Sequence, residues 1–426
     1  MINKTSVLRG KIFLPASKSY TIRAFMVAAC GGSSIIMHPS DCADAQAALA
    51  VAQRLGAVIK RRASDQLAIQ APRIPQKFSR IQVQESGTVL RFLLPLLCLR
   101  GKAVTVEGRG TLRGRPNLYL IRALAAMGMR IQGTGAGASV PVRILGGALT
   151  GGRVKCDASL SSQFISGLLI TCPQLAQDTR LSLTGKSVVS FEYITMTRLV
   201  LAEAGVIITQ DGPRDFLIKG GQKFRGLKRF AVPSDYGLAA FLLAAAALTQ
   251  SDVILEGHFA DRWIQADGRI LEFFKKMGAR FTSTGRSLRI KGPFAISGGE
   301  FSLQDCPDLV PIMTVLALFG RGPTRLRHIG HARVKESDRI SDLRRELLKV
   351  GADISEKKDE LVITPKHQYK EGCLLDPHQD HRLAMAFAIL GLKLGVRIKD
   401  RDCVNKSYPG FWEDLRELGG NLKFYS

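Results

Sequence analysis

The chain has 426 residues, of which 46% are hydrophobic and 23% are charged, and its formal net charge is +25. This length exceeds a typical single hydrophobic core and predicts two or more domains, and the composition is globular rather than disordered or fibrous. No apolar run reaches the roughly 20 residues of a membrane-spanning helix, and the basic residues are dispersed rather than gathered in one block, which argues against a specific nucleic-acid site.

The N-terminal stretch MINKTSVLRGKIFLPASKS has no signal-peptide core and predicts a strand followed by a turn. The eight cysteines are scattered along the chain, and none forms a CxxC pair. We therefore expect reduced thiols in a cytoplasmic protein.

Six segments along the chain share one pattern, an amphipathic helix followed by a glycine and the start of a strand. The glycines are Gly56, Gly128, Gly205, Gly278, Gly351 and Gly419, at intervals of 72, 77, 73, 73 and 68 residues. Glycine ends a helix readily because it accepts the left-handed backbone conformation. A constant interval of this kind predicts a repeated supersecondary unit.

A second series alternates with the first and consists of almost wholly apolar helices, which we expect to be buried. Small or polar residues mark their starts, at Lys18, Gly87, Ser162, Asp235, Asp308 and His381. Each unit thus holds two helices and several β-rich segments. Six units, divided three and three near Pro233–Asp235, predict two similar domains rather than a solenoid.

The polar residues stand where the buried helices begin. Helix N-termini present free N–H groups and positive partial charge, so helix starts that converge on the gap between two domains would bind anions. The first three starts carry Lys18, Gly87, Thr88, Ser161, Ser162 and Gln163, and the last three carry Asp235, Asp308 and Asp380. We expect anion-binding donors in one domain and acid/base groups in the other.

Residues 331–340 read HARVKESDRI and precede an amphipathic helix. Ser337 is a good N-cap, which favours a solvated helix start. Lys335 and Arg339, however, are cations at the positive end of the helix dipole, which favours a site for an anion. The residues alone leave both interpretations open.

Eight motifs in order span nearly the whole chain. They are LPASKSYTIRA, SGTVLRFL, LRGRP, SLSSQFISGLL, PDLVP, RVKESDR, QDHRLAMA and NKSYPGF. In sequence and spacing the chain resembles the 5-enolpyruvylshikimate-3-phosphate synthases. The resemblance implies an α/β fold of two similar domains, each a threefold repeat of a βαβαββ unit (an inside-out α/β barrel), which close over the substrates. We expect one domain at 17–233 and the other at 1–16 with 234–426.

The resemblance also implies the reaction, in which the carboxyvinyl group of phosphoenolpyruvate moves to the 5-hydroxyl of shikimate 3-phosphate. It calls for neither a metal nor an organic cofactor. By position, the residues matched to shikimate 3-phosphate are Lys18, Ser19, Arg23, Ser161, Ser162, Gln163, Ser190, Tyr193, Asp308, His331 and Lys335. Those matched to phosphoenolpyruvate are Lys18, Gly87, Arg115, Gln163, Arg339, His381, Arg382 and Lys406.

The same resemblance assigns proton transfers to Asp308, as base for the hydroxyl, and to Glu336 assisted by Lys18, as proton donor to carbon and later acceptor. The unfavourable cations near Ser337 would then be offset by substrate anions. It further implies a monomer that acts on small molecules, away from membranes, and is a target of glyphosate.

Three departures from the family pattern stand out. Glu85 and His331 occupy positions that are commonly Asn, and the stretch before Tyr193 differs from the usual Ser-Lys-Pro-Tyr. Two alternatives remain, the sister enolpyruvyl transferase that acts on UDP-N-acetylglucosamine, and a non-catalytic or RNA-acting protein on a related scaffold. The first usually has Lys-Asn and a loop Cys, where this chain has Lys18-Ser19 and no Cys in GRGTLRGRP.

Overall fold

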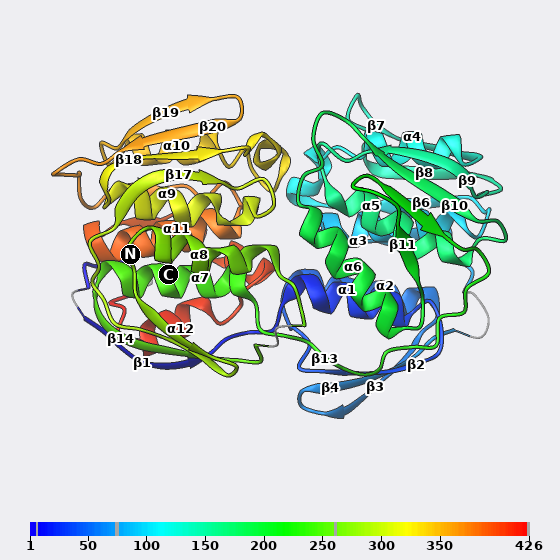
Figure 1. Cartoon of the computed structure of the whole chain (residues 1–426), viewed down its shortest axis with the longest axis horizontal. Coiled ribbons are helices and arrows are strands. Elements are labelled where there is room, and N and C mark those ends of the chain that lie inside the picture. The colour runs from blue at the N-terminus through cyan, green and yellow to red at the C-terminus, as the bar shows by residue number, and fades with distance from the viewer. Residues whose placement is uncertain (6, 73–75, 260–261, 424–426) are drawn as a thin grey trace. The chain divides into compact units, whose positions relative to one another are not determined.

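The computed structural model describes residues 1–5, 7–72, 76–259 and 262–423. It divides into two compact units, which are each described by themselves (Figure 1). Unit 1 consists of Met1–Pro15 and Pro233–Ser426, and unit 2 of Ala16–Val232. These bounds differ by one residue from those expected at 17 and 233.

Unit 2 shows the repeated element most plainly between residues 80 and 147. Its members in chain order are β5 (Arg80–Gln82), α3 (Gly87–Cys98), β6 (Val104–Glu107), α4 (Leu118–Ala126), β7 (Met129–Thr134) and β8 (Ser139–Gly147). The strands form one sheet in the order β5-β6-β8-β7, in which β5 pairs parallel with β6 and the other pairs are antiparallel. This is the expected βαβαββ arrangement.

The next element repeats it with β9 (Gly152–Asp157), α5 (Ser162–Thr171), β10 (Thr179–Thr184), α6 (Phe191–Glu203), β11 (Ile208–Gln210) and β12 (Asp215–Ile218). The third begins the unit with α1 (Lys18–Ala28), β2 (Ser33–Met37), α2 (Ala43–Leu55), β3 (Val58–Ala63) and β4 (Gln66–Gln70). Its edge strand is β13 (Lys228–Ala231), which returns from the far end of the unit to pair parallel with β2.

Unit 1 mirrors this exchange, because its edge strand β1 (Val7–Phe13) pairs parallel with β14 (Gln250–Glu256). The rest of that element is α7 (Tyr236–Leu248), α8 (Ile270–Lys276), β15 (Phe281–Thr284) and β16 (Ser287–Ile290). The following element holds β17 (Ser297–Ser302), α9 (Val310–Leu318), β18 (Arg321–Arg327), α10 (Ser341–Leu348), β19 (Asp353–Lys357) and β20 (Glu360–Thr364).

The sixth element departs from the expected βαβαββ pattern. It contains β21 (Leu374–Leu375), α11 (His381–Leu394), β22 (Arg397–Ile398) and α12 (Phe411–Glu417). Within the described residues its sheet has only β21 and β22, and Ile2 adds single bridges to Val396 and Leu422. The repeat is therefore complete five times and shortened once.

The two predicted helix series are both confirmed. In unit 1 the helices α7, α9 and α11 contact one another, and every residue from Gly237 to Leu248 of α7 is buried. The six glycines that follow the amphipathic helices all have positive φ, with values of 107°, 98°, 79°, 90°, 80° and 103° in chain order. The apolar helices thus lie inside each unit and the sheets outside.

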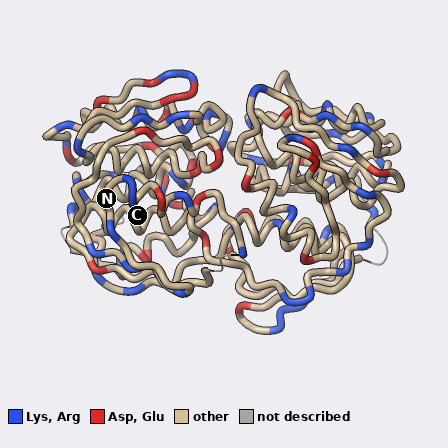
Figure 2. The backbone as a smooth tube through the Cα atoms, viewed as in Figure 1, with Lys and Arg blue, Asp and Glu red and all other residues tan. Residues whose placement is uncertain are grey.

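The predicted starts of the apolar helices are also close to those observed. Helices α1, α3, α5 and α11 begin at Lys18, Gly87, Ser162 and His381. Asp235 accepts a hydrogen bond from Leu238 N at the start of α7 (3.1 Å). No helix within the described part of the chain is long and apolar enough to cross a membrane. Lys and Arg are spread over both units rather than gathered on one element (Figure 2).

Candidate active site

In unit 2, the first helix start holds a lysine against a carboxylate. Lys18 is the first residue of α1, and its Nζ lies 3.2 Å from Oδ2 of Asp44 in the neighbouring helix α2. Both side chains are largely shielded from water, with 13% and 6% of their surface exposed. Asp44 was not among the predicted site residues, because an Asp in the first turn of an amphipathic helix looks like an ordinary favourable helix-start residue.

Arg23 joins α1 to α6 from within the core. Its Nε donates to Thr197 Oγ1, its Nη1 to the carbonyl of Ser19 and its Nη2 to the carbonyl of Tyr193, each at 2.9 Å. The guanidinium also lies 5.3 Å from the ring centre of Phe92 and 5.7 Å from that of Tyr193. Burial lowers the pKa of Arg23 to about 10, so the side chain remains a cation at neutral pH. Arg23 therefore brings Ser19 and Tyr193 together through their carbonyl groups.

Gly87 and Arg115 are in direct contact. A Cβ atom placed on Gly87 would lie 2.7 Å from Nη1 of Arg115 and 2.8 Å from its Cζ, so the guanidinium rests on the glycine backbone at the start of α3. The carbonyl of Arg115 accepts hydrogen bonds from Asn117 Nδ2 and from Ser139 Oγ, both at 3.1 Å. Gly87 thus lets an arginine side chain approach the backbone closely.

Glu85, one of the three departures from the family pattern, lies beside the loop that leads to Arg115. Its carboxylate sits against Gly110, whose φ of +54° begins the turn Gly110–Gly114, and a Cβ atom on Gly110 would overlap that carboxylate. The side chain at position 85 therefore contacts the backbone of the Arg115 loop.

The start of α5 presents a hydroxyl, a second serine and an amide. Ser161 caps the helix by accepting from Gln163 N (3.3 Å), and Ser162, the first helical residue, is 4% exposed. The Gln163 side chain is held at both ends, because Oε1 accepts from Arg91 Nη1 (2.7 Å) and Nε2 donates to Thr88 Oγ1 (2.9 Å). Arg91 was not predicted as a site residue.

Ser190 precedes α6 in a left-handed backbone conformation, with φ 55° and ψ 45°. A side-chain-bearing residue pays about 1–2 kcal/mol for that conformation. Among the described residues its hydroxyl makes no capping hydrogen bond, and the residue is 4% exposed. Strain of this kind gathers at functional positions.

In unit 1, a single guanidinium organises the candidate site. Arg339 Nη1 donates to Asp308 Oδ1 (2.6 Å), Nη2 to Glu336 Oε2 (3.0 Å) and Nε to Asp380 Oδ2 (2.7 Å). Only 1% of the Arg339 side chain is exposed. Burial alone would lower the pKa of Arg339, but the three carboxylates raise it above its ordinary value. We call Arg339, Asp308, Glu336 and Asp380 the arginine–carboxylate cluster.

The cluster corrects two expectations about HARVKESDRI. The helix begins at Ser341 rather than near Ser337, and the carboxylate of Asp338 accepts from Ile340 N and Ser341 N, both at 3.1 Å. Ser337 instead donates to Asp380 Oδ2 (3.2 Å). The charge of Arg339 is therefore balanced by protein carboxylates.

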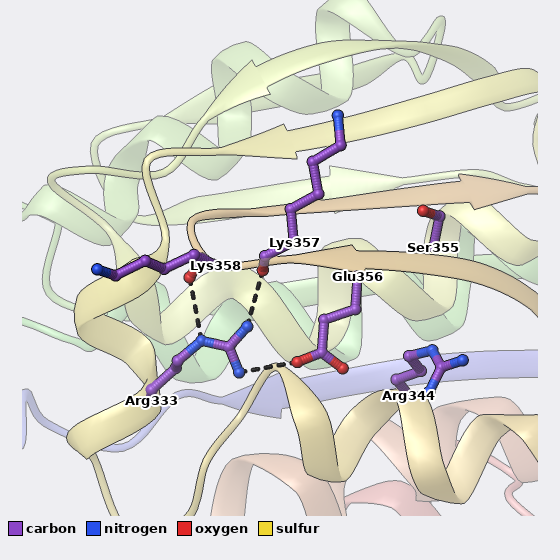
Figure 3. A pocket seen from close by; sticks show the side chains of 6 residues that line it. All are labelled: Arg333, Arg344, Ser355, Glu356, Lys357 and Lys358. Carbon is purple, nitrogen blue, oxygen red and sulfur yellow. Dashed lines mark hydrogen bonds and ion pairs between the residues drawn. The ribbon is translucent and has the colours of Figure 1, made fainter.

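Arg333 connects the loop 331–340 to the hairpin of β19 and β20 (Figure 3). Its Nη1 lies 3.0 Å from Asp338 Oδ2 and 2.9 Å from Glu356 Oε1, while Nε and Nη2 donate to the carbonyls of Lys358 (3.0 Å) and Lys357 (2.7 Å). The amino groups of Lys357 and Lys358 point away from Arg333 in Figure 3. The hollow that these residues line is thus a contact between the loop and the β19–β20 hairpin, held by Arg333.

Asp308 lies in the turn Pro307–Leu309 before α9, between two arginines. Its Oδ1 is 2.6 Å from Arg339 Nη1 and its Oδ2 is 2.8 Å from Arg382 Nη2. Burial would raise the pKa of Asp308, but the charges of Arg382, Arg339 and Lys335 outweigh it and hold the pKa well below its usual value. The carboxylate is ionised and, without a ligand, only weakly basic.

Glu336 and Lys406 complete this group. Lys406 Nζ lies 3.9 Å from Glu336 Oε1, and each side chain is 8% exposed. Arg382 also donates to the carbonyl of Gly237 (3.3 Å) and approaches Asp267 Oδ2 (3.8 Å). Neither Asp380 nor Asp267 was predicted as a site residue, although Asp380 had been noted as a helix start.

His331 lies in the turn Gly330–Val334, which packs against the turn that carries Asp308. Burial and the nearby charge of Lys335 lower the pKa of His331 to about 3, so its ring is neutral. Lys335 is partly exposed. His381, at the start of α11, is 1% exposed, and its Nδ1 is 3.9 Å from Asp380 Oδ1.

Solved structures identify the class of this fold. The EPSP synthase of Acinetobacter baumannii superposes with a TM-score of 0.77 at 26% identity, over 98% of this chain and 97% of that one. The enolpyruvyl transferase NikO from Streptomyces tendae superposes with a TM-score of 0.79 at 18% identity, over 99% of this chain and 97% of that one. The chain therefore has the enolpyruvyl transferase fold.

The family follows from the sequence comparisons. The family model described as EPSP synthase (3-phosphoshikimate 1-carboxyvinyltransferase) matches residues 2–415. A 3-phosphoshikimate 1-carboxyvinyltransferase of Methanosarcina mazei is 37% identical over 99% of this chain and 98% of its own length. The chain belongs to the EPSP synthase family, as the motif order predicted, and is a transferase. Neither of the two alternatives is favoured.

Proposed function

We propose that this protein transfers the carboxyvinyl group of phosphoenolpyruvate to the 5-hydroxyl of shikimate 3-phosphate, giving 5-enolpyruvylshikimate 3-phosphate and inorganic phosphate. The product leads to chorismate and the aromatic amino acids. One observation carries the proposal beyond family membership. Asp308 and Glu336, the two carboxylates that the reaction needs for proton transfer, both contact the guanidinium of Arg339.

The roles that we propose in unit 2 concern binding. Both substrates carry several negative charges, and cations and helix starts shielded from water bind such groups far more strongly than they would in bulk water. Ser161, Ser162 and Ser190 suit the phosphate of shikimate 3-phosphate, because their hydroxyls stand at helix starts. Gly87 and Arg115 lie together at the start of α3, where phosphoenolpyruvate would meet backbone N–H groups and a guanidinium.

The roles that we propose in unit 1 concern proton transfer. Glu336 in its protonated form, assisted by Lys18, gives a proton to the methylene carbon of phosphoenolpyruvate, which makes C2 electrophilic. Asp308 takes the proton of the 5-hydroxyl as the hydroxyl oxygen bonds to C2. The methyl group of the tetrahedral adduct then returns a proton to Glu336 as the C–O bond to phosphate breaks. The double bond forms again, and phosphate leaves with the proton that Asp308 holds.

The electrostatics of Asp308 suggest how its basicity is controlled. Arg382 and Arg339 hold its pKa well below the usual range, although burial would raise it. Both arginines are also expected to bind phosphoenolpyruvate. If the carboxylate or phosphate of phosphoenolpyruvate accepts hydrogen bonds from these two arginines, their positive charge stabilises the ionised form of Asp308 less, and the pKa of Asp308 rises. The base is then activated when the second substrate is in place.

We also propose that the protein acts as a monomer in the cytoplasm and binds glyphosate at the phosphoenolpyruvate site. All eight cysteines are free thiols, which suits a reducing compartment. Size-exclusion chromatography with light scattering should give the mass of one chain. Glyphosate should inhibit turnover competitively with phosphoenolpyruvate.

The decisive experiment measures phosphate release with purified protein, phosphoenolpyruvate and shikimate 3-phosphate, with each substrate omitted in turn. We expect release only when both are present. UDP-N-acetylglucosamine in place of shikimate 3-phosphate is the matched control and should give none. Phosphate release from phosphoenolpyruvate with UDP-N-acetylglucosamine but not with shikimate 3-phosphate would reject the proposal. Release from phosphoenolpyruvate without any acceptor would reject it as well.

A further inference from the structure

Arg91 is a buried residue of unit 2 whose side chain makes several hydrogen bonds, and none of the predicted roles uses it. It lies on α3 and is 3% exposed, one helical turn beyond Gly87. Its Nε donates to Asn117 Oδ1 (3.1 Å) and its Nη2 to the carbonyl of Pro116 (3.0 Å). Its Nη1 donates to Gln163 Oε1 (2.7 Å) and lies 3.4 Å from Ser161 Oγ. One planar group thus reaches two separate segments, 116–117 and 161–163.

The first segment leads directly to Arg115. Asn117 accepts from Arg91 through its Oδ1, and its own Nδ2 donates to the carbonyl of Arg115 (3.1 Å). The side chain of Asn117 is fully buried. Arg91 is therefore two hydrogen bonds away from the backbone of Arg115, the residue that we expect to meet phosphoenolpyruvate.

The second segment carries the amide of Gln163. A guanidinium has donors only, so the group that faces Arg91 has to be the carbonyl oxygen of that amide. The amide nitrogen consequently faces Thr88, to which it donates one hydrogen at 2.9 Å. Within the described ranges, its second hydrogen has no protein acceptor. Gln163 is partly exposed, so this hydrogen is available to a ligand.

We propose that Arg91 is a positioning residue that sets which end of the Gln163 amide faces the substrates and holds the Arg115 loop against the start of α5. The amide then offers an N–H donor to an anionic or hydroxyl oxygen. Lysine could not replace arginine, because a single ammonium cannot span Asn117, Pro116 and Gln163 at once. The stacking of Arg91 over the Phe164 ring, 4.9 Å from its centre, fixes the plane of the fork.

The inference rests on the proposed function, so wild-type turnover is measured first in the same phosphate-release assay. Arg91→Lys should lower kcat/KM for phosphoenolpyruvate by about 100-fold, the scale expected for a misplaced site group. The matched control is Arg198→Lys. Arg198 also stacks on a phenylalanine and donates to a glutamine, Gln210 (2.8 Å), yet it touches no proposed site residue through those bonds. It should change kcat/KM less than about twofold.

A double-mutant cycle separates positioning from general stability. Because Arg91 acts in part through Gln163 and in part through the Arg115 loop, Arg91→Lys should lower kcat/KM clearly less in a Gln163→Ala background than in the wild type, whereas its effect on thermal unfolding should persist there. Additive losses in kcat/KM would overturn the inference, as would unchanged kinetics in Arg91→Lys. Absence of turnover in the wild type would instead reject the proposed function.

Discussion

The two units carry their candidate site residues on the same repeated element but with different chemistry. In unit 2, Arg23 and Arg91 are held by carbonyl, hydroxyl and amide oxygens, which are neutral. In unit 1, Arg339 is held by three carboxylates. The first arrangement keeps its positive charge for incoming anions, and the second cancels most of it in advance.

The difference shows what the repeat supplies and what it leaves open. A βαβαββ element places a helix start at the same relative position each time. The residue that occupies that start then decides whether the position binds an anion or moves a proton. Ser161 and Asp380 are both N-cap residues of apolar helices, yet Ser161 presents a neutral hydroxyl and Asp380 is a carboxylate that holds the Arg339 guanidinium.

The largest effect should come from Glu336, the carboxylate in unit 1 that we propose as the proton donor to the methylene carbon of phosphoenolpyruvate. Glu336→Gln keeps the shape of the side chain but removes its proton transfer, so turnover should fall by a factor on the order of 10²–10⁴. Calorimetry should show nearly unchanged affinity for shikimate 3-phosphate. Glu300→Gln is the control, since Glu300 pairs with Arg327 on the surface of the same unit. Turnover that survives in Glu336→Gln would remove this residue from the mechanism.

The contrast between charged and neutral partners can be measured directly through stability. Arg339→Met removes the cation that three carboxylates share and should cost about 3–5 kcal/mol of unfolding free energy, as for other broken buried ion pairs. Arg23→Met leaves only neutral acceptors and should cost about 1–3 kcal/mol. Urea denaturation followed by circular dichroism compares the two variants. Equal losses would mean that the carboxylates of the cluster are not ionised together.

The neutral ring of His331 predicts an acid-sensitive stability in unit 1. Its pKa is lowered in the folded chain from 6.5 to about 3, by burial first and then by Lys335. Above pH 6.5, the pKa of the unfolded chain, the neutral ring is present in both states and the fold keeps its full stability. As the pH falls from 6.5 toward 3, the unfolded chain binds a proton that the folded chain does not, so the folded state loses stability. Relative to His331→Asn, the wild type should lose about 1.4 kcal/mol per pH unit across this range. The exposed His367, changed to Asn, serves as the control and should not flatten the profile.

The smallest effect concerns the close approach in unit 2. Gly87→Ala places a methyl group within 2.7 Å of Arg115 Nη1, so the guanidinium has to shift. The Michaelis constant for phosphoenolpyruvate should rise about 10-fold, in line with the cost of overpacking. The affinity for glyphosate should fall by a larger factor. Gly114→Ala is the matched control, because a Cβ atom there meets nothing within 4 Å. Equal kinetics in both variants would show that Gly87 serves only the turn.

The repeat could be predicted from sequence because each of its signals is local. A glycine after an amphipathic helix and a polar residue before an apolar one are visible within ten residues, and both series appeared in the structure within a residue or so. The shortened sixth element escaped notice because its helices keep the pattern while its strands shrink to two residues. Strand length is a weak signal in a segment that is bounded by Gly and Pro.

The partners of the site residues were harder to foresee, because they come from distant parts of the chain. Asp380 reaches Arg339 from another helix start, and Asp44 reaches Lys18 from α2. Ser337 was misread as well. The helix begins four residues after Ser337, so Asp338 accepts from the backbone N–H groups at its start, while the hydroxyl of Ser337 donates to Asp380. Long-range charge pairing explains the partners of Arg339 and Lys18, and a neighbouring cap residue explains Ser337.

The exchanged edge strands β1 and β13 bear on the order in which the protein is made. Unit 2 is one continuous stretch, so it can finish its fold as soon as β13 leaves the ribosome and pairs with β2. The strand β1 precedes unit 2 in the chain and is synthesised before it, yet its partner β14 follows the whole of unit 2. Until then β1 is an unpaired edge that carries the exposed Val7 and Phe13, the kind of segment that invites wrong pairing. A strand that is made before unit 2 therefore reaches its place only after unit 2 is complete.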